Sequence, residues 1–228
     1  MTPELRPSSL DHVALWVSER EALAAFLCDH LGMHAIERTD TFTLLGVDAK
    51  LGKVTLFDAE GPRELGALER IVLRVGDLNA ALERLPEPPA RSDGAMAKFD
   101  APGGVPIGLE EADGSDYDLD HVVLGMADPD AAIAQFERLG FERYDGGVRV
   151  ADRRVRIEHG SRDDGGRPLL NHLALLVDDA HAVQWGAETR GLEIDDVKDA
   201  ANTFAVFVRG PEDVRIEYVE HKPGFALT

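Results

Sequence analysis

The chain repeats itself, and this repeat limits which folds the sequence can form. Residues 10–33 (LDHVALWVSEREALAAFLCDHLGM) resemble residues 119–141 (LDHVVLGMADPDAAIAQFERLGF), with His12 and His121 in register. Each copy begins with an apolar strand, passes through an acidic turn and continues as an amphipathic helix. Both helices stop at a Leu-Gly pair, where glycine can adopt the left-handed conformation that ends a helix. A strand followed by a helix is therefore predicted twice.

A second pair of segments follows the same plan. Residues 68–85 align with residues 170–192, which places Arg70 opposite His172. Short β-type runs separated by Gly and Asp turns follow each helix, so each unit reads as strand, helix and then two or three strands. Four such βαβββ units fill the chain, and the predicted fold class is α+β.

Four potential metal ligands lie in four different β-type runs of the second half. The runs are LDHVVLGM, VRIEHG, NHLALLV and VRIEYVE, and they carry His121, Glu158, His172 and Glu217. Two imidazole nitrogens and two carboxylate oxygens suit a divalent ion such as Zn²⁺, Ni²⁺, Co²⁺, Mn²⁺ or Fe²⁺. The sequence therefore offers a complete donor set, provided that the strands converge.

This pattern resembles the vicinal oxygen chelate superfamily, which includes glyoxalases, extradiol dioxygenases and bleomycin-binding proteins. The resemblance spans nearly the whole chain, and its most specific elements are DHVVLGM, NHLALLV and GPEDVRIEYVE. It implies that two βαβββ units pair into a curved, incompletely closed sheet that cups a metal, with ligands on the first and last strand of each unit. In the second half these positions are His121, Glu158, His172 and Glu217, so one divalent ion per chain is expected.

The polar, turn-rich segment 111–118 (EADGSDYD) divides the four units into two halves. We therefore expect two glyoxalase-like domains with curved mixed sheets, residues 1–113 and residues 114–228. The first-half positions that correspond to the ligands are His12, Phe57, Arg70 and Gly108. Only one of these can bind a metal, so the N-terminal site is expected to be vacated and His12 to be structural.

Two arginines and one aromatic residue are candidates for contact with a substrate. Strand alternation turns Arg156 and Arg215 to the same faces as the proposed ligands Glu158 and Glu217. Either arginine could bind a carboxylate or oxyanion, or could simply pair with a glutamate. Phe207 lies on the strand before the one that carries Glu217, and it is the predicted pocket aromatic.

The number of ligands decides which chemistry is possible. Four ligands leave a six-coordinate ion two positions for vicinal oxygens, and Glu217 or Glu158 would shuttle a proton beside a metal-stabilised enolate. Three ligands, His121, His172 and Glu217, would leave room for a catecholate and O₂, as in an extradiol ring-cleaving dioxygenase. The complete donor set favours the lyase or isomerase. A small-molecule (antibiotic) binding protein without turnover is the third alternative.

Charge and hydropathy exclude several classes of partner. The chain has 43 acidic and 24 basic residues, a formal net charge of −19 at pH 7. Without a basic stripe, neither nucleic acid nor an anionic membrane is an expected partner. No apolar run approaches about 18 residues, and the N-terminus does not read as a signal peptide, so a cytoplasmic protein is expected. Four units can build both cups in one chain, which is compatible with a monomer or a homodimer.

Overall fold

The computed structural model describes residues 5–48, 53–89, 91–92, 96–160 and 167–223. The first unit comprises β1 (Ser9–Val17), α1 (Arg20–His30), β2 (His34–Arg38), β3 (Phe42–Gly46) and β4 (Lys53–Asp58). The second comprises β5 (Leu68–Val75), α2 (Leu78–Glu83), β6 (Arg91–Ser92), β7 (Met96–Ala101), the 3₁₀ turn η1 (Pro102–Gly104) and β8 (Val105–Glu111). The third comprises β9 (Leu119–Met126), α3 (Pro129–Arg138), β10 (Glu142–Tyr144), β11 (Gly147–Val150) and β12 (Arg153–His159). The fourth comprises β13 (Leu170–Leu176), α4 (Ala180–Arg190), β14 (Ile194–Asp199), β15 (Thr203–Arg209), the 3₁₀ turn η2 (Pro211–Asp213) and β16 (Arg215–His221). The predicted α+β class and the four units are confirmed.

In the second, third and fourth units, the acidic turn after the first strand caps the helix. The carboxylates of Asp77, Asp128 and Asp179 each accept a hydrogen bond, 2.8–3.0 Å long, from the backbone N–H three residues later. Each bond satisfies a donor that the first turn of a helix leaves without an intrahelical partner. Glycine with positive φ follows three of the helices: Gly32 (+61°) after α1, Gly140 (+91°) after α3 and Gly191 (+66°) after α4.

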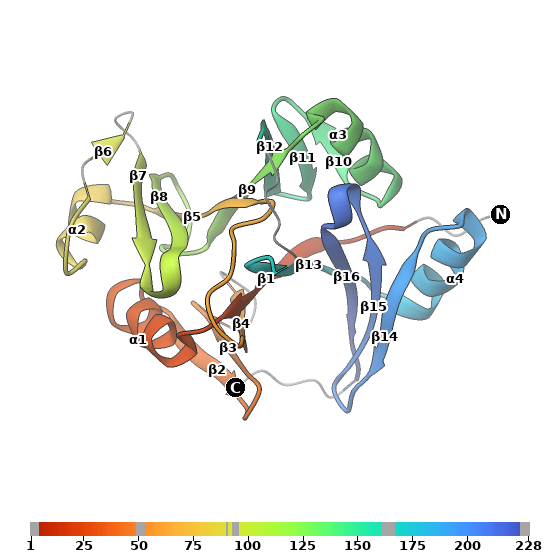
Figure 1. Cartoon of the computed structure of the whole chain (residues 1–228), viewed down its shortest axis with the longest axis horizontal. Coiled ribbons are helices and arrows are strands. Elements are labelled where there is room, and N and C mark those ends of the chain that lie inside the picture. The colour runs from red at the N-terminus through yellow and green to blue at the C-terminus, as the bar shows by residue number, and fades with distance from the viewer. Residues whose placement is uncertain (1–4, 49–52, 90, 93–95, 161–166, 224–228) are drawn as a thin grey trace.

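The units pair differently from the sequence prediction. One eight-stranded sheet has the order β14-β15-β16-β13-β1-β4-β3-β2, and the other β10-β11-β12-β9-β5-β8-β7-β6. The first unit therefore shares a sheet with the fourth through the antiparallel pair β1 and β13, and the second shares a sheet with the third through β5 and β9. Both sheets are curved and open at their edges (Figure 1).

The expectation that consecutive units share a cup is therefore wrong. Residues 112–118 connect β8 to β9, which belong to the same sheet, so the division at 113/114 does not separate the two sheets. Within a unit, the first and last strands pair in parallel, as β1 and β4 do. The free edge of each first strand can accept another unit's first strand, and the repeat does not encode which one.

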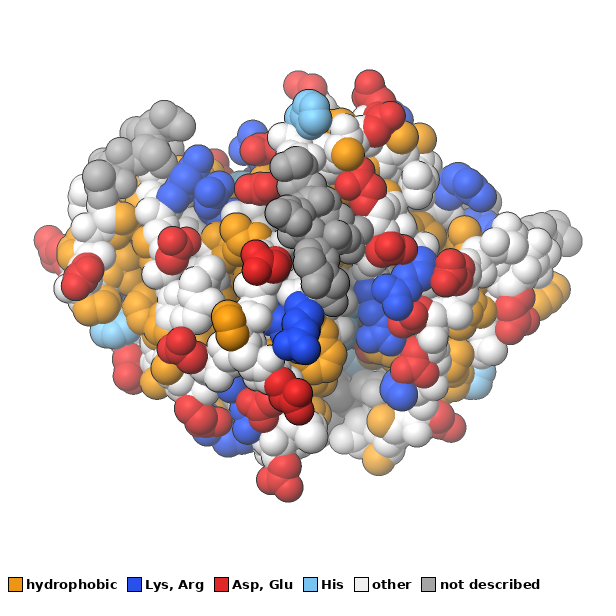
Figure 2. Space-filling view, in the orientation of Figure 1, with side chains coloured by type: hydrophobic (Ala, Val, Ile, Leu, Met, Phe, Trp, Pro, Cys, Tyr) orange, Lys and Arg blue, Asp and Glu red, His pale blue; other side chains and the backbone are white. Residues whose placement is uncertain are grey.

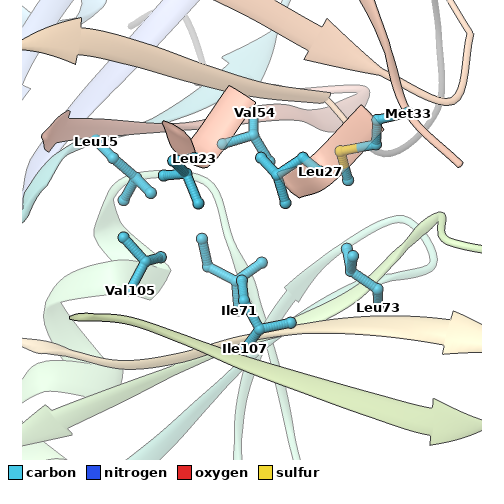
Figure 3. Close-up of a pocket in the computed structure, with 9 residues that line it drawn as sticks. All are labelled: Leu15, Leu23, Leu27, Met33, Val54, Ile71, Leu73, Val105 and Ile107. Atoms are coloured by element: carbon cyan, nitrogen blue, oxygen red, sulfur yellow. The ribbon is translucent and has the colours of Figure 1, made fainter. Parts of the chain in front are cut away.

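The first and second units pack against each other through apolar side chains. Leu15, Leu23 and Leu27 from β1 and α1 face Ile71 and other aliphatic residues of β5 and β8 across a narrow gap (Figure 3). The gap holds about 10 Å³, no more than a single water molecule needs, and its lining is entirely apolar. This contact belongs to one hydrophobic core that runs through all four units and holds both sheets in a fixed arrangement.

The surface carries the negative charge that the composition requires. On the face seen in Figure 2, acidic side chains are scattered widely and basic side chains form small groups among them. In the described part of the chain, the helices are too short or too polar to cross a membrane.

Candidate metal centre

Three potential metal ligands converge on the concave face of the first sheet. They are His12 on β1, His172 on β13 and Glu217 on β16. The Nε2 atoms of His12 and His172 lie 3.2 Å apart, and Glu217 Oε2 lies 2.9 Å from His172 Nε2 and 3.5 Å from His12 Nε2. Donors at right angles on an ion, each about 2.1 Å from it, are about 3 Å from each other. The spacing therefore fits a shared cation.

Both imidazoles are held by the residue that precedes them. His12 Nδ1 lies 2.9 Å from Asp11 Oδ2, and His172 Nδ1 lies 2.9 Å from Asn171 Oδ1. These oxygens can only accept, so each Nδ1 carries the donated hydrogen, and Nε2 is the nitrogen of each ring that is turned to the centre. Such a hydrogen bond on the far nitrogen is the usual support of a metal-bound histidine.

The convergence of three lone pairs is unfavourable without a cation. Glu217 Oε2 is buried and has no hydrogen-bond partner in the described part of the chain. Burial holds the pKa of His172 below its usual range, which favours the neutral ring. Burial acts to raise the pKa of Glu217, but the neighbouring His172 and His12 rings outweigh it, and the net pKa is lowered. Neutral imidazoles and an ionised carboxylate are the forms that bind a metal, so the three residues fit one divalent ion.

A buried lysine contacts the carboxylate that holds His12 in place. Lys53 is 2% exposed, and its Nζ lies 2.7 and 2.8 Å from the two carboxylate oxygens of Asp11. Asp11 in turn accepts a hydrogen bond from His12. His12 and Lys53 lie opposite each other in the register of the adjacent strands β1 and β4. This ion pair fixes Asp11, and it helps to hold the pKa of that carboxyl below its usual range although burial opposes the effect. The position of His12 is therefore set by a chain of buried polar contacts.

Phe57 occupies the fourth ligand position of this sheet. It lies on β4, the last strand of the first unit, and its ring centroid is 6.3 Å from that of His172. A phenyl ring cannot bind a divalent ion as a carboxylate does, so the protein supplies three ligands here.

A cavity of about 190 Å³ opens beside the three ligands. Its apolar wall includes Phe42, Phe57 and Phe207 together with Leu44 and Val219. Its polar lining is formed by Asp11, His12, Glu37, Lys53, Thr55, His172, Thr203, Glu217 and His221. The cluster therefore faces a space that is large enough for a small molecule.

The predicted four-ligand site is divided between the two sheets. His172 and Glu217 meet as predicted, but His121 on β9 and Glu158 on β12 belong to the second sheet. The Glu158 side chain is 54% exposed and lies 3.9 Å from Arg156. The prediction that all four residues bind one ion is wrong, because the first unit, and not the third, pairs with the fourth.

Of the three residues predicted to contact a substrate, Phe207 lines the cavity, and the two arginines do not. Phe207 lines the cavity, with its ring centroid 5.3 Å from that of His172. Arg215 lies over the Phe207 ring at 3.9 Å, and its Nε is 2.6 Å from Asp195 Oδ2, so its charge is already paired. Arg156 is on the second sheet, away from this cavity.

His12 is the one candidate ligand of this centre that the sequence alone predicts to be structural. Its register with His121 in the repeat and the Asp-His pair that both segments share were the available signals. Within the first half alone, the other ligand positions hold Phe57, Arg70 and Gly108 and supply no metal ligand. Those ligands come instead from the fourth unit.

Comparison with known proteins agrees with this architecture. Residues 9–88 match the model of the Glyoxalase/Bleomycin resistance protein/Dioxygenase superfamily. A putative dioxygenase from Bacillus subtilis has a similar structure, with a TM-score of 0.75 and 17% identity over 97% of this chain and 87% of that one. A V278E mutant of glyoxalase I from Zea mays gives 0.73 and 17%, over 93% and 92% of the two chains. The cppA protein of Streptococcus pneumoniae TIGR4 gives 0.62 and 16%, over 92% and 97%.

No curated protein matches the sequence. At these identities the solved structures establish the fold alone. The family model matches at the level of sequence, over the first unit and the start of the second. Residues 9–88 therefore match this superfamily in sequence, and the chain as a whole shares the fold of these solved structures.

Proposed function

We propose that this chain is a divalent-metal-dependent enzyme that cleaves a small aromatic ring carrying two adjacent hydroxyl groups, in the manner of an extradiol dioxygenase. His12, His172 and Glu217 would hold the ion. The observation that carries the proposal is the three-residue donor set, with Phe57 at the fourth position. Two histidines and one carboxylate leave a six-coordinate ion three further positions, the arrangement typical of non-haem iron oxygenases.

The cavity favours a single aromatic ring. An apolar cavity of about 150 Å³ admits benzene, so 190 Å³ beside the ligands suits one substituted ring. Phe42, Phe57 and Phe207 supply apolar surfaces on which a ring can pack edge-to-face or offset.

The residues around the cavity can assist the reaction. His221 lines it, and burial lowers the pKa of this imidazole, so that the neutral ring can accept a proton from a substrate hydroxyl. Lys53, whose Nζ is 2.7 Å from Asp11, would keep that carboxylate hydrogen-bonded to His12 and so hold the imidazole in place while substrate binds. When bound, the metal would act as a Lewis acid that lowers the pKa of those hydroxyls and brings the reactants together.

The lyase or isomerase favoured by the sequence depended on a second metal-bound glutamate. Glu158 is on the other sheet, and Glu217 is the one glutamate among the three converging ligands. A proton shuttle would therefore have to use the carboxylate that also holds the ion. For this reason the geometry favours the dioxygenase.

The test compares two reactions of the same preparation. The protein loaded anaerobically with Fe²⁺ should consume O₂ when catechols of one ring are added, and the ring-cleaved products should absorb in the visible or near-ultraviolet. It should not isomerise the hemithioacetal of glutathione and methylglyoxal in the presence of Zn²⁺, Ni²⁺ or Mn²⁺. Isomerase activity without O₂ consumption would contradict the proposal.

A substitution at Phe57 gives a second test. Phe57→Glu places a fourth carboxylate beside the ion, which should preserve metal binding but reduce ring cleavage at least tenfold. Phe57→Leu, which adds no ligand, is the matched control and should retain most of the activity.

A further inference from the structure

The second sheet repeats part of the metal centre. There, Asp120 Oδ1 accepts a hydrogen bond of 2.7 Å from His121 Nδ1, and the same carboxylate is ion-paired with Arg154. Arg154 pairs with His121 across β12 and β9, as Lys53 pairs with His12 across β4 and β1. The order cation, aspartate, histidine is thus the same in both sheets.

His121 presents a nitrogen for which the described part of the chain has no partner. The residue is 1% exposed, and its Nε2 is buried without a hydrogen bond. Leaving a buried polar atom unpaired is unfavourable, so such an atom usually marks a bound water or ligand. In the first sheet, the corresponding Nε2 atom of His12 is one of the three potential ligand atoms that converge.

In the second sheet, the two positions that correspond to His172 and Glu217 hold other residues, and these two residues fit each other. By strand register, Arg70 takes the place of His172, and Gly108 takes the place of Glu217. A Cβ on Gly108 would lie 3.0 Å from Arg70 Cδ, tighter than most real contacts. Glycine at this position therefore makes room for the arginine side chain. An arginine and a glycine therefore stand where the first sheet has two of its three converging ligands.

The charge of Arg70 is not neutralised by the described residues, since it makes no ion pair or hydrogen bond with them. Arg70 and Arg156 flank Val123 on opposite sides of β9, which turns all three side chains to one face. Arg156 is 45% exposed, and its contact with Glu158 is long, at 3.9 Å. Arg70 and Arg156 put two positive charges on this face, and the nearby Glu110 carboxylate, whose Oε2 lies 3.6 Å from His121 Nδ1, is a negative one.

We propose that this face of the second sheet binds a small carboxylate. Arg70 forms the paired hydrogen bonds that a guanidinium makes to a carboxylate, and His121 Nε2 completes the site with a hydrogen bond to the same ligand. The site uses no residue of the metal centre, so it stands independently of the proposed function.

The proposal is tested by titrating the full-length, metal-loaded protein with acetate at pH 7 and measuring heat. Binding in the low millimolar range (about 1–10 mM) is expected for so small a ligand. Arg70→Met should weaken it at least tenfold. His172→Ala, in the metal centre, and Arg143→Met, an exposed arginine paired with Glu137, should leave it unchanged. Equal binding by Arg70→Met, or loss of binding in His172→Ala, would overturn the proposal.

Two further arms decide the remaining outcomes. Inorganic phosphate should bind more weakly than acetate, and tighter binding of phosphate would overturn the carboxylate assignment. Arg70→Lys keeps the charge and loses the paired geometry, so it should bind several-fold more weakly than the native chain. If Arg70→Met does not fold, the acetate affinity of Arg70→Lys tests the proposal instead. Native-like affinity in Arg70→Lys would then overturn it.

Discussion

His12 and His172 are separated by 160 positions in the sequence, yet their Nε2 atoms lie 3.2 Å apart. The antiparallel pairing of β1 with β13 brings them together, because His172 pairs with Ala14, two residues beyond His12. A metal centre at this seam therefore depends on the contact between the first and fourth units.

The first prediction concerns metal binding. His12→Ala should weaken the affinity for Zn²⁺ or Fe²⁺ at least a hundredfold, since it removes one of three ligands. His121→Ala, the matched substitution in the second sheet, should leave about one ion per chain bound, as should Glu158→Gln. Metal content after dialysis, measured by atomic emission, checks this. Loss of the ion in His121→Ala with retention in His12→Ala would restore the ligand set expected from the sequence.

The second prediction tests the register between the sheets. Arg70→His combined with Gly108→Glu would place two histidines and one glutamate in the second sheet, at the positions that His12, His172 and Glu217 hold in the first. The double variant should bind two divalent ions per chain instead of one. Gly108→Glu alone should not, because Arg70 remains to pair with the new carboxylate. One ion in the double variant, with its fold intact, would show that the two faces are not equivalent.

The third prediction concerns the buried lysine. Lys53→Met leaves the Asp11 carboxylate without its cation, and removing one partner of a buried pair costs about 3–5 kcal/mol of unfolding free energy. Lys198→Met removes an exposed lysine, 66% accessible, from Asp196 and should cost less than about 1 kcal/mol. Urea denaturation of the metal-free proteins measures both. Similar costs for the two variants would show that the burial of Lys53 has no energetic consequence.

The fourth prediction is a dependence of stability on pH. Burial acts to raise the pKa of Asp120, but His121, Arg154 and Arg74 outweigh it, and the net pKa is lowered. A lowered folded-state pKa contributes stability above the unfolded value, about 3.9, and the contribution is lost as the pH falls through the folded value. Asp120→Asn should therefore cost about 2 kcal/mol at pH 7 and progressively less below pH 4.

Denaturation of Asp120→Asn at pH 7, 5 and 3 measures this difference. The exposed Asp40→Asn should differ little from the native chain at any of these values. A cost for Asp120→Asn that is the same at pH 3 and pH 7 would contradict the assignment.

The fifth prediction concerns the contact between the third and fourth units. The Tyr218 hydroxyl, fully buried, donates a hydrogen bond of 2.6 Å to the backbone oxygen of Leu139. Tyr218→Phe should cost about 1–2 kcal/mol, because that oxygen loses its buried donor. Tyr144→Phe removes a hydroxyl for which the described residues supply no hydrogen bond, and it should change the unfolding free energy by less than about 0.5 kcal/mol. Thermal denaturation ranks the two variants.

The sequence by itself determined the local elements and the types of ligand. Strand periodicity, acidic turns and helix-ending glycines act over a few residues, and they predicted four βαβββ units in order. His172 and Glu217 were found for the same reason, since both lie in one unit whose strands β13 and β16 pair directly. Phe207, on the neighbouring strand, followed from that pairing.

Only the tertiary structure decided which units share a sheet. Each first strand leaves a free edge that is chemically similar in all four units, so the choice of partner depends on how the apolar faces pack together, as Leu15 and Leu23 do against Ile71. That choice joined His12 to His172 and Glu217, and it placed His121 beside Arg70 in the second sheet. The residues that can bind a metal were readable in the sequence, but the set that meets around one ion was fixed by the pairing of distant strands.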